Sequence, residues 1–291
     1  MAKSSAHKLG QLIGNIFEAS IKEVLNPIIT DRGLYLDYKK ERRARGNKKE
    51  VMGRDLLGNS HKLDYVIERG GTEDSVGDPI AFVEIAWRRY SKHSKNKAEE
   101  IGDVLDVMYR TYSSIHPFKG AILAGVFTGS AISQLKSKGI TVAYIDYEKI
   151  ISQFSGYGLE IAWDEDTLEA ELDNKVSELE SYISQNEAQI ISDMVENNKI
   201  EFDNFKSELI KTLERKVSKI TIVPHHGESS TFLVSSDAIE FLDAYNELEV
   251  KGYNFISYEI FITYKESIGD IKATFTNKIE AKKFIEAVTN I

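Results

Sequence analysis

The chain has 291 residues, a net charge of −9, and 42% hydrophobic and 29% charged residues, proportions close to those of globular domains. The absence of cysteine excludes disulfides and thiolate metal sites and fits a reducing cytoplasm. No stretch approaches the roughly 20 apolar residues of a membrane helix, and the polar start MAKSSAHKLG lacks the apolar core of a signal peptide, so we expect a cytoplasmic protein with no membrane partner.

The first 163 residues alternate predicted helices and strands. Apolar residues at three-and-four spacing predict a helix that starts near Leu9 and ends near Asn26-Pro27. Strand-like stretches follow at 33–38, 62–68 and 81–87, and a helix is expected over 95–113. A buried strand in GAILAGVFTG, a short helix closed by Gly139, and a strand leading into a helix in ITVAYIDYEKII complete the segment. The alternation predicts an α/β domain with a mixed sheet over residues 1–163.

Two further segments differ in composition from the first. Residues 164–217 are acidic and lack glycine and proline, which predicts one long helix or two helices broken near Asn197-Asn198. The apolar stripe of such a helix needs a partner, either a neighbouring domain or a second subunit. Residues 218–291 predict a small α+β domain for DNA recognition or dimerisation, with strands in KITIVPHHG and STFLVSS, a helix ending at Gly252, a hairpin of YEIFITYK and IKATFT, and a final helix in NKIEAKKFIEAV.

Charge is distributed unevenly along the chain. Residues 1–120 carry +4, whereas 121–215 carry −10 and 216–291 carry −3. Because phosphate affinity depends on local lysine and arginine, the run KKERRARGNKK is a candidate DNA-facing strip, with a solvated charged loop as the alternative. The expected DNA contacts, in this run and in the basic loop after position 87, are Lys39, Lys40, Arg42, Arg43, Arg45, Lys48, Lys49, Arg89, Lys92 and Lys95.

Two carboxylates stand inside apolar, strand-forming runs. Asp64 lies in KLDYVI and Glu84 in FVEIAW, where an ionised side chain is costly unless it is paired or exposed at a site; a solvent-facing edge position is the alternative for either one. The glycine-rich connection GGTEDSVGDP favours antiparallel pairing of the two strands. Mg²⁺ prefers oxygen ligands and promotes phosphodiester hydrolysis, so the pair is a candidate magnesium site.

The order of these elements resembles the D-x(n)-E-x-K core of the PD-(D/E)XK nucleases, the superfamily of most type II restriction endonucleases. The resemblance covers roughly residues 8–150 and includes the basic loop that opens the helix after Glu84. Glu18 in GNIFEASIKEVL falls where many members carry an extra acidic residue that helps to hold metal. The resemblance implies a restriction-endonuclease-like fold and a Mg²⁺ site made by Asp64, Glu84 and Glu18.

The sequence departs from that pattern at Ala86, where the family keeps a lysine that polarises the attacking water or stabilises the pentavalent phosphorus. Three cations are candidates to replace it. Arg88 shares a strand face with Glu84, Lys62 shares one with Asp64, and Lys97 can reach inward from the following helix. A lysine suits water activation, because burial lowers a lysine pKa readily, whereas arginine stays charged and suits charge stabilisation.

Other acids and histidines are weaker candidates. Glu99 and Glu100 can complete a metal shell, but we favour exposed acids that pair with Lys95 or Lys97. His225-His226 is read as part of a turn rather than as a metal dyad, because adjacent strand residues point to opposite faces. His61 is read as a loop residue with a phosphate contact as the alternative.

The sequence therefore indicates a Mg²⁺-dependent endodeoxyribonuclease of the type II restriction kind that hydrolyses double-stranded DNA. Cleavage of both strands needs two centres, so a homodimer is the natural expectation. Two alternatives stay open. One is a catalytically silent DNA-binding protein that kept the nuclease fold, and the other is a structure-selective repair or phage nuclease.

Overall fold

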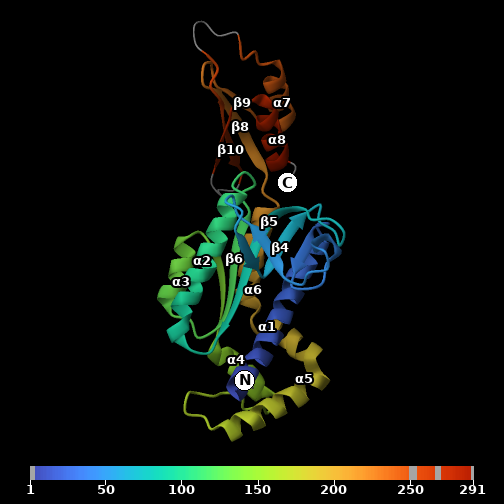
Figure 1. Cartoon of the computed structure of the whole chain (residues 1–291), viewed down its shortest axis with the longest axis vertical. Coiled ribbons are helices and arrows are strands. Elements are labelled where there is room, and N and C mark those ends of the chain that lie inside the picture. The colour runs from blue at the N-terminus through green and yellow to red at the C-terminus, as the bar shows by residue number, and fades with distance from the viewer. Residues whose placement is uncertain (1–3, 249–253, 266–269, 290–291) are drawn as a thin grey trace. The chain divides into compact units, whose positions relative to one another are not determined.

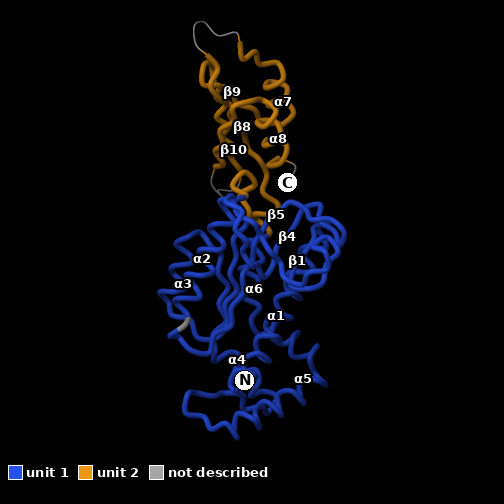
Figure 2. Tube along the Cα trace, viewed as in Figure 1, with its two compact units in different colours: residues 1–111, 118–209 blue, residues 112–117, 210–291 orange. Residues whose placement is uncertain are grey.

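The computed structural model describes residues 4–248, 254–265 and 270–289, apart from the side chain of His93, and the chain divides into two compact units. Unit 1 comprises residues 1–111 and 118–209, and unit 2 comprises 112–117 and 210–291 (Figure 2). The candidate active-site residues all belong to unit 1.

The centre of unit 1 is a five-stranded mixed sheet in the order β1-β4-β5-β6-β7 (Figure 1). Its strands are β1 (Tyr35–Tyr38), β4 (Tyr65–Arg69), β5 (Asp78–Arg88), β6 (Phe118–Gly125) and β7 (Thr141–Asp146). β1, β4 and β5 pair antiparallel, whereas β5, β6 and β7 pair parallel. The apolar middle of β6 is fully buried, as a central parallel strand requires. The predicted α/β class with a mixed sheet is confirmed.

The helices α1 (Ser5–Thr30), α2 (Ser94–Thr111), α3 (Gly129–Ser137), α4 (Tyr147–Gly156) and α6 (Lys199–Leu213) cover the two faces of this sheet, and α5 (Glu169–Asn197) packs against α1 and α4. Two neighbouring residues of β6 show which helix covers which face of the sheet. Lys119 binds Asp106 of α2 at 2.8 Å, whereas Gly120 lies against Phe205 of α6. Because Glu84 is in register with Ala121, Glu84 lies on the face of Lys119 and of α2.

The strand predicted over 62–68 is two strands in the structure. β3 (Ser60–Leu63) forms a separate hairpin with β2 (Val51–Arg54), and the chain enters the central sheet only at Tyr65. Asp64 occupies the junction between β3 and β4. Period-two alternation applies only within one continuous strand, so it no longer relates Lys62 to Asp64, although the Asp64 charge still acts on Lys62 and raises its pKa.

α1 extends beyond its predicted end. It starts after Ser4, whose hydroxyl accepts a hydrogen bond from the His7 N–H, and it continues through Pro27 to Thr30. Proline removes one helical hydrogen bond, but Ile28 and Ile29 beyond it are buried. Burial of these two side chains offsets the loss, so the last turn stays helical.

The acidic helical segment packs within unit 1 for most of its length. The chain breaks at Asn198 between α5 and α6, as predicted, and a second break that was not predicted occurs at Asn186. α5 packs along α1, where the Ser5 N–H donates to Glu169 at 2.9 Å and Lys8 pairs with Glu180 at 2.8 Å. Its apolar stripe is thus covered inside the chain and does not require a second subunit. Among the described residues, no helix is both long and apolar enough to cross a bilayer.

Unit 2 contains a four-stranded antiparallel sheet in the order β11-β10-β8-β9. The strands are β8 (Val217–Pro224), β9 (Ser230–Phe232), β10 (Tyr258–Tyr264) and β11 (Ile271–Phe275), and the helices α7 (Ser235–Ala244) and α8 (Lys278–Thr289) complete its core. α7 ends at Ala244, because Tyr245 is extended, and the predicted end at Gly252 lies outside the described residues. The other predicted elements of this region are present.

Candidate active site

Two backbone N–H groups hold the Asp64 and Glu84 carboxylates side by side. The antiparallel register of β4 and β5, in which Tyr65 pairs with Val83, brings Asp64 beside Glu84. The Asp64 N–H donates to Glu84 Oε1 at 3.2 Å, and the Ile85 N–H donates to Asp64 Oδ2 at 2.9 Å. Each carboxylate is thereby held by the backbone next to the other, so the structure brings together the two residues that sequence analysis selected.

Burial dominates the electrostatics of Glu84. Its side chain is 6% exposed, and desolvation raises the pKa of Glu84 to about 8, with a further increase from the Asp64 charge. The Asp64 N–H and the positive charge of Lys97 act in the opposite direction. Near neutral pH, Glu84 therefore holds a proton when no cation is bound, and a divalent cation would displace that proton.

Glu18 lies near this pair but is not part of it. Burial raises the pKa of Glu18, the Asp64 charge raises it further, and Lys39 and Lys62 oppose the change. The Tyr65 hydroxyl, which sequence analysis did not select, donates to the Glu18 carbonyl at 3.0 Å and so fixes α1 beside β4. Among the described residues, no group of three or more His, Cys, Asp or Glu side chains is arranged to hold a metal ion.

The three cations proposed in place of a lysine at Ala86 have different surroundings. Lys97 of α2 is 16% exposed, pairs with Glu100 at 2.8 Å and lowers the pKa of Glu84 by its charge. Lys62 is 57% exposed and pairs with Glu50 at 2.7 Å, which raises the pKa of Lys62. Lys97 thus acts by charge on Glu84, whereas Lys62, on the β2-β3 hairpin, interacts by charge with Asp64 and Glu18.

Arg88 ends β5 on the same face as Glu84. Its Nη1 donates to the Trp87 carbonyl at 2.8 Å, and burial lowers the pKa of Arg88, opposed by the charge of Glu100. Glu100 pairs with Lys97, as favoured from the sequence, while Glu99 is exposed. Lys97, Glu100 and Arg88 therefore form a charged row along α2 and the end of β5.

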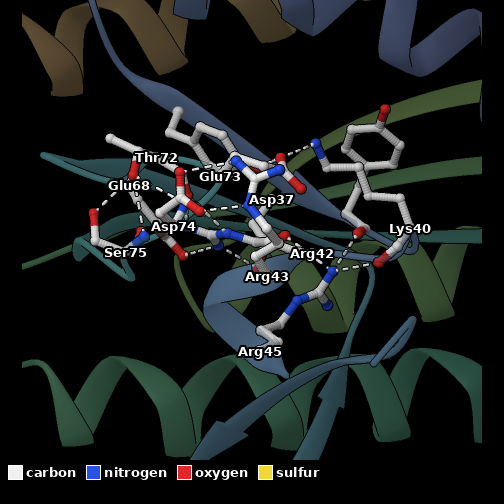
Figure 3. Close-up of polar contacts among 12 residues, drawn as sticks. Asp37, Lys40, Arg42, Arg43, Arg45, Glu68, Thr72, Glu73, Asp74 and Ser75 are labelled. Carbon is white, nitrogen blue, oxygen red and sulfur yellow. Dashed lines mark hydrogen bonds and ion pairs between the residues drawn. The ribbon is translucent and has the colours of Figure 1, made fainter. Parts of the chain in front are cut away.

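Arg42 requires a correction to the predicted DNA-facing strip. Its guanidinium is fully buried and binds both oxygens of Glu68, Asp37, and the carbonyls of Thr72 and Ser75 (Figure 3). Burial disfavours its charge, but the hydrogen bonds to Glu68 and the charges of Asp37 and Glu68 prevail and raise the pKa of Arg42. A side chain without exposed surface cannot contact DNA, so Arg42 instead joins the basic strip to the connection between β4 and β5.

The remaining residues of the strip divide into tethered and exposed ones. Arg45 is 11% exposed and donates to the Tyr38 and Lys40 carbonyls, so it too supports the loop. Lys40, Arg43 and Lys49 are paired with Glu73, Asp74 and Glu41. Lys39 and Lys48 are exposed, and Lys39 lies near enough to lower the pKa of Glu18.

The basic loop after β5 also has structural contacts. Arg89 donates to the Trp163 carbonyl from Nε at 2.8 Å and lies over the Tyr147 ring at 4.3 Å. Lys92 pairs with Glu165 at 2.6 Å, whereas Lys95 is exposed. The predicted DNA contacts that the fold leaves accessible are therefore the exposed residues Lys39, Lys48 and Lys95, together with Arg43, Lys49 and Lys92, which stay 60 to 67% exposed in their surface ion pairs.

The turn predicted for His225-His226 is confirmed, whereas the loop predicted for His61 is wrong. His225 and His226 lie in a turn after β8, and His226 contacts the Tyr245 hydroxyl and the Glu247 carbonyl. His61 lies in β3 rather than in a loop and binds Asp55 at 3.0 Å. The histidines described here thus have protein partners that account for their positions.

Comparisons with known proteins identify no relative. No protein-family model matches the chain, no curated protein matches it, and no solved structure matches it.

Proposed function

We propose that this chain is a Mg²⁺-dependent endonuclease that hydrolyses phosphodiester bonds in double-stranded DNA through Asp64 and Glu84. One observation carries the proposal: two backbone hydrogen bonds hold the carboxylates of Asp64, just before β4, and Glu84, in β5, side by side, and Glu84 is buried deeply enough to raise its pKa to about 8. Strongly perturbed acids in such pairs are concentrated at functional sites.

The donor set fits a magnesium ion. Mg²⁺ is commonly held by one or two carboxylates, with water and substrate phosphate as the other ligands, so a third protein carboxylate is not required. Asp64 and Glu84 would hold the ion, with Glu18 near enough to bind one of its waters. When bound, the ion would neutralise phosphate charge and lower the pKa of a water near it.

Lys97 would take the part of the missing lysine at position 86. Its ammonium group acts on Glu84 by charge, and its limited exposure keeps that interaction from being screened by solvent. Donation from Lys97 to a phosphate oxygen would stabilise the negative charge that develops in the transition state. Arg88, on the same face, would add a second positive charge farther along β5.

The mixed sheet also supports a restriction-endonuclease-like core. In that core a helix precedes an antiparallel β-meander that carries the two acids, and a helix then leads to a parallel strand. Here α1, β1, β4, β5, α2 and β6 follow this order, with β5 and β6 parallel. Type II restriction activity and a homodimer with one centre for each strand are parts of the same proposal.

Cleavage of supercoiled plasmid DNA in the presence of Mg²⁺ tests the proposal. We expect nicking and linearisation by the wild-type chain, and losses of at least about 100-fold in Asp64→Asn and Glu84→Gln, because each removes a metal-binding charge. Glu99→Gln, an exposed acid on α2, is the matched control and should cleave normally. Equal cleavage by wild type and both active-site variants would refute the proposal.

A silent DNA-binding protein is the second candidate, favoured by the ion pair that already occupies Lys97. It predicts DNA binding without cleavage on methylated or unmethylated substrates. Discrete fragments from long duplex DNA would support restriction activity, whereas preferential cutting of forks or flaps would identify a structure-selective nuclease.

A further inference from the structure

A cavity of about 380 Å³ opens at the carboxyl end of β5, next to the first turns of α1. It is lined by His7, Gly10 and Gln11 of α1, by the segment from Trp87 to Tyr90, and by Trp163. Its volume falls within the range of about 300 to 1,000 Å³ that is typical of small-molecule sites. None of these residues belongs to the Asp64–Glu84 pair, although Arg88 is shared with the charged row described above.

The walls of the cavity are aromatic and are held in place before any ligand binds. The Arg89 guanidinium lies 5.1 Å from the Tyr90 ring centre and 5.4 Å from that of Trp163, and it donates to the Trp163 carbonyl at 2.8 Å. The Trp87 ring lies 6.1 Å from that of Tyr147. Arg89 thus organises the wall, and flat aromatic ligands are the natural partners of indole and phenol rings.

The floor of the cavity is small and polar. A Cβ added at Gly10 would lie 3.7 Å from Trp87 Nε1, so a hydrogen atom at this position leaves the indole edge accessible. One turn of α1 places His7, Gly10 and Gln11 on the same side. An amide and an imidazole offer both donors and acceptors, which is the pattern that the edge of a nucleobase presents.

Arg88 supplies a guanidinium group that can donate further hydrogen bonds to a ligand. One of its nitrogen atoms donates to the Trp87 carbonyl, and the other donors have no protein hydrogen-bond partner among the residues that the structure describes. A half-buried guanidinium in that situation favours an anion such as a phosphate. Aromatic walls, a mixed donor and acceptor edge, and this cation together match the base and the phosphate of a nucleotide.

We propose that this cavity binds a nucleotide, with its base stacked against Trp87 and Tyr90, its edge against Gln11, and its phosphate toward Arg88. The source is either a free mononucleotide or a base turned out of a DNA strand. The site stands independently of the nuclease proposal, because its residues can bind a nucleotide whether or not Asp64 and Glu84 hold a metal ion.

Intrinsic fluorescence offers a direct test, because the chain contains two tryptophans and both line the cavity. Titration with dAMP, excited where the nucleotide does not absorb, should quench the fluorescence saturably, whereas inorganic phosphate should not. Titration with a single-stranded oligodeoxynucleotide, in EDTA to prevent cleavage, forms the second arm. Saturable quenching by dAMP identifies the free nucleotide as the ligand, and quenching by the oligonucleotide alone identifies a strand base.

Two variants tie the signal to the cavity. Gly10→Leu should fill the floor, and Gln11→Glu should add a negative charge to a site that binds an anionic ligand, so each should weaken binding by about tenfold or more. Asn15→Leu, an exposed position on the same helix outside the cavity, should bind as wild type does, and melting curves verify that all three variants fold. The inference is overturned if neither probe quenches saturably, or if folded Gly10→Leu and Gln11→Glu bind as tightly as wild type. Loss of plasmid cleavage in Asp64→Asn with nucleotide binding intact keeps the two proposals separate.

Discussion

The substitution Glu84→Gln should stabilise the metal-free protein above neutral pH while it abolishes cleavage. Glu84 is buried beside Asp64, so its carboxylate form is unfavourable in the folded state and its pKa rises from an ordinary 4.5 to about 8. Glutamine keeps the acceptor for the Asp64 N–H and never ionises. The variant therefore removes the cost of the buried charge and retains the hydrogen bond.

The magnitude follows from proton linkage. Between pH 4.5 and about 8 the unfolded chain has lost the proton of Glu84 and the folded chain retains it, so the free energy of unfolding falls by about 1.4 kcal/mol per pH unit. This contribution is fully present below pH 4.5 and is lost as the pH rises through 8. Over the whole interval it amounts to roughly 5 kcal/mol, which is a large part of the stability of an ordinary domain.

Urea unfolding in EDTA from pH 5 to pH 9 measures the effect. Glu84→Gln should flatten the pH dependence in this window and exceed the wild-type unfolding free energy by a few kcal/mol at pH 8.5. Glu99→Gln, an exposed acid on α2, should follow the wild-type curve. If Glu84→Gln and wild type change in parallel between pH 5 and pH 8, Glu84 does not carry the proton and the electrostatic argument is refuted.

Three further predictions concern the same unit. Mg²⁺ should raise the melting temperature of wild type more at pH 8 than at pH 6, because binding releases the Glu84 proton, and EDTA should reverse the increase. An equal increase in Glu84→Gln would contradict a Mg²⁺ site at Glu84. Lys97→Met should reduce cleavage by about 100-fold or more with DNA binding retained, whereas Lys95→Met should keep the wild-type turnover. The opposite ranking in a single-turnover assay would exclude Lys97 as the cation that assists cleavage. Arg42→Met should cost about 3 to 5 kcal/mol in urea unfolding, because it removes the buried cation shared by the buried carboxylates of Asp37 and Glu68. The exposed variant Arg43→Met should unfold as wild type does, and equal effects of the two substitutions would refute a special role for the buried Arg42.

The sequence predicted most elements of the sheet because each strand has a local signature. A buried apolar run marks β6, a run rich in β-branched and aromatic residues marks β7, and the pairing of Asp64 with Glu84 follows from two strands joined by a glycine-rich connection. Gly77 shows why that connection needs glycine: a Cβ there would lie 2.2 Å from the Arg69 carbonyl oxygen. Local patterns of this kind survive tertiary packing, so they can be read from the chain alone.

The misjudged features depend on contacts between distant parts of the chain. Arg42 has the sequence environment of a solvated basic run, and only the return of the chain at Glu68 and Thr72 buries it. The break at Asp64 is equally invisible, because polar and apolar residues alternate across it without interruption. Pro27 disfavours helix locally, and the burial of the two isoleucines after it decides the outcome. In each case tertiary contacts override a valid local tendency.

The free energy of unfolding that the buried Glu84 carboxylate costs the folded protein favours a functional explanation for this residue. A glutamine at this position would accept the same hydrogen bond from Asp64 without burying a charge, so stability alone gives no reason for a carboxylic acid. What glutamine lacks is the ability to become an anion when a cation arrives. The neighbouring Lys97 opposes the raised pKa, which places the proton where a metal ion near neutral pH can displace it. A buried carboxyl group that lowers the stability of the free protein, and whose anion is stabilised only when a cation binds, is expected at a cation-binding site.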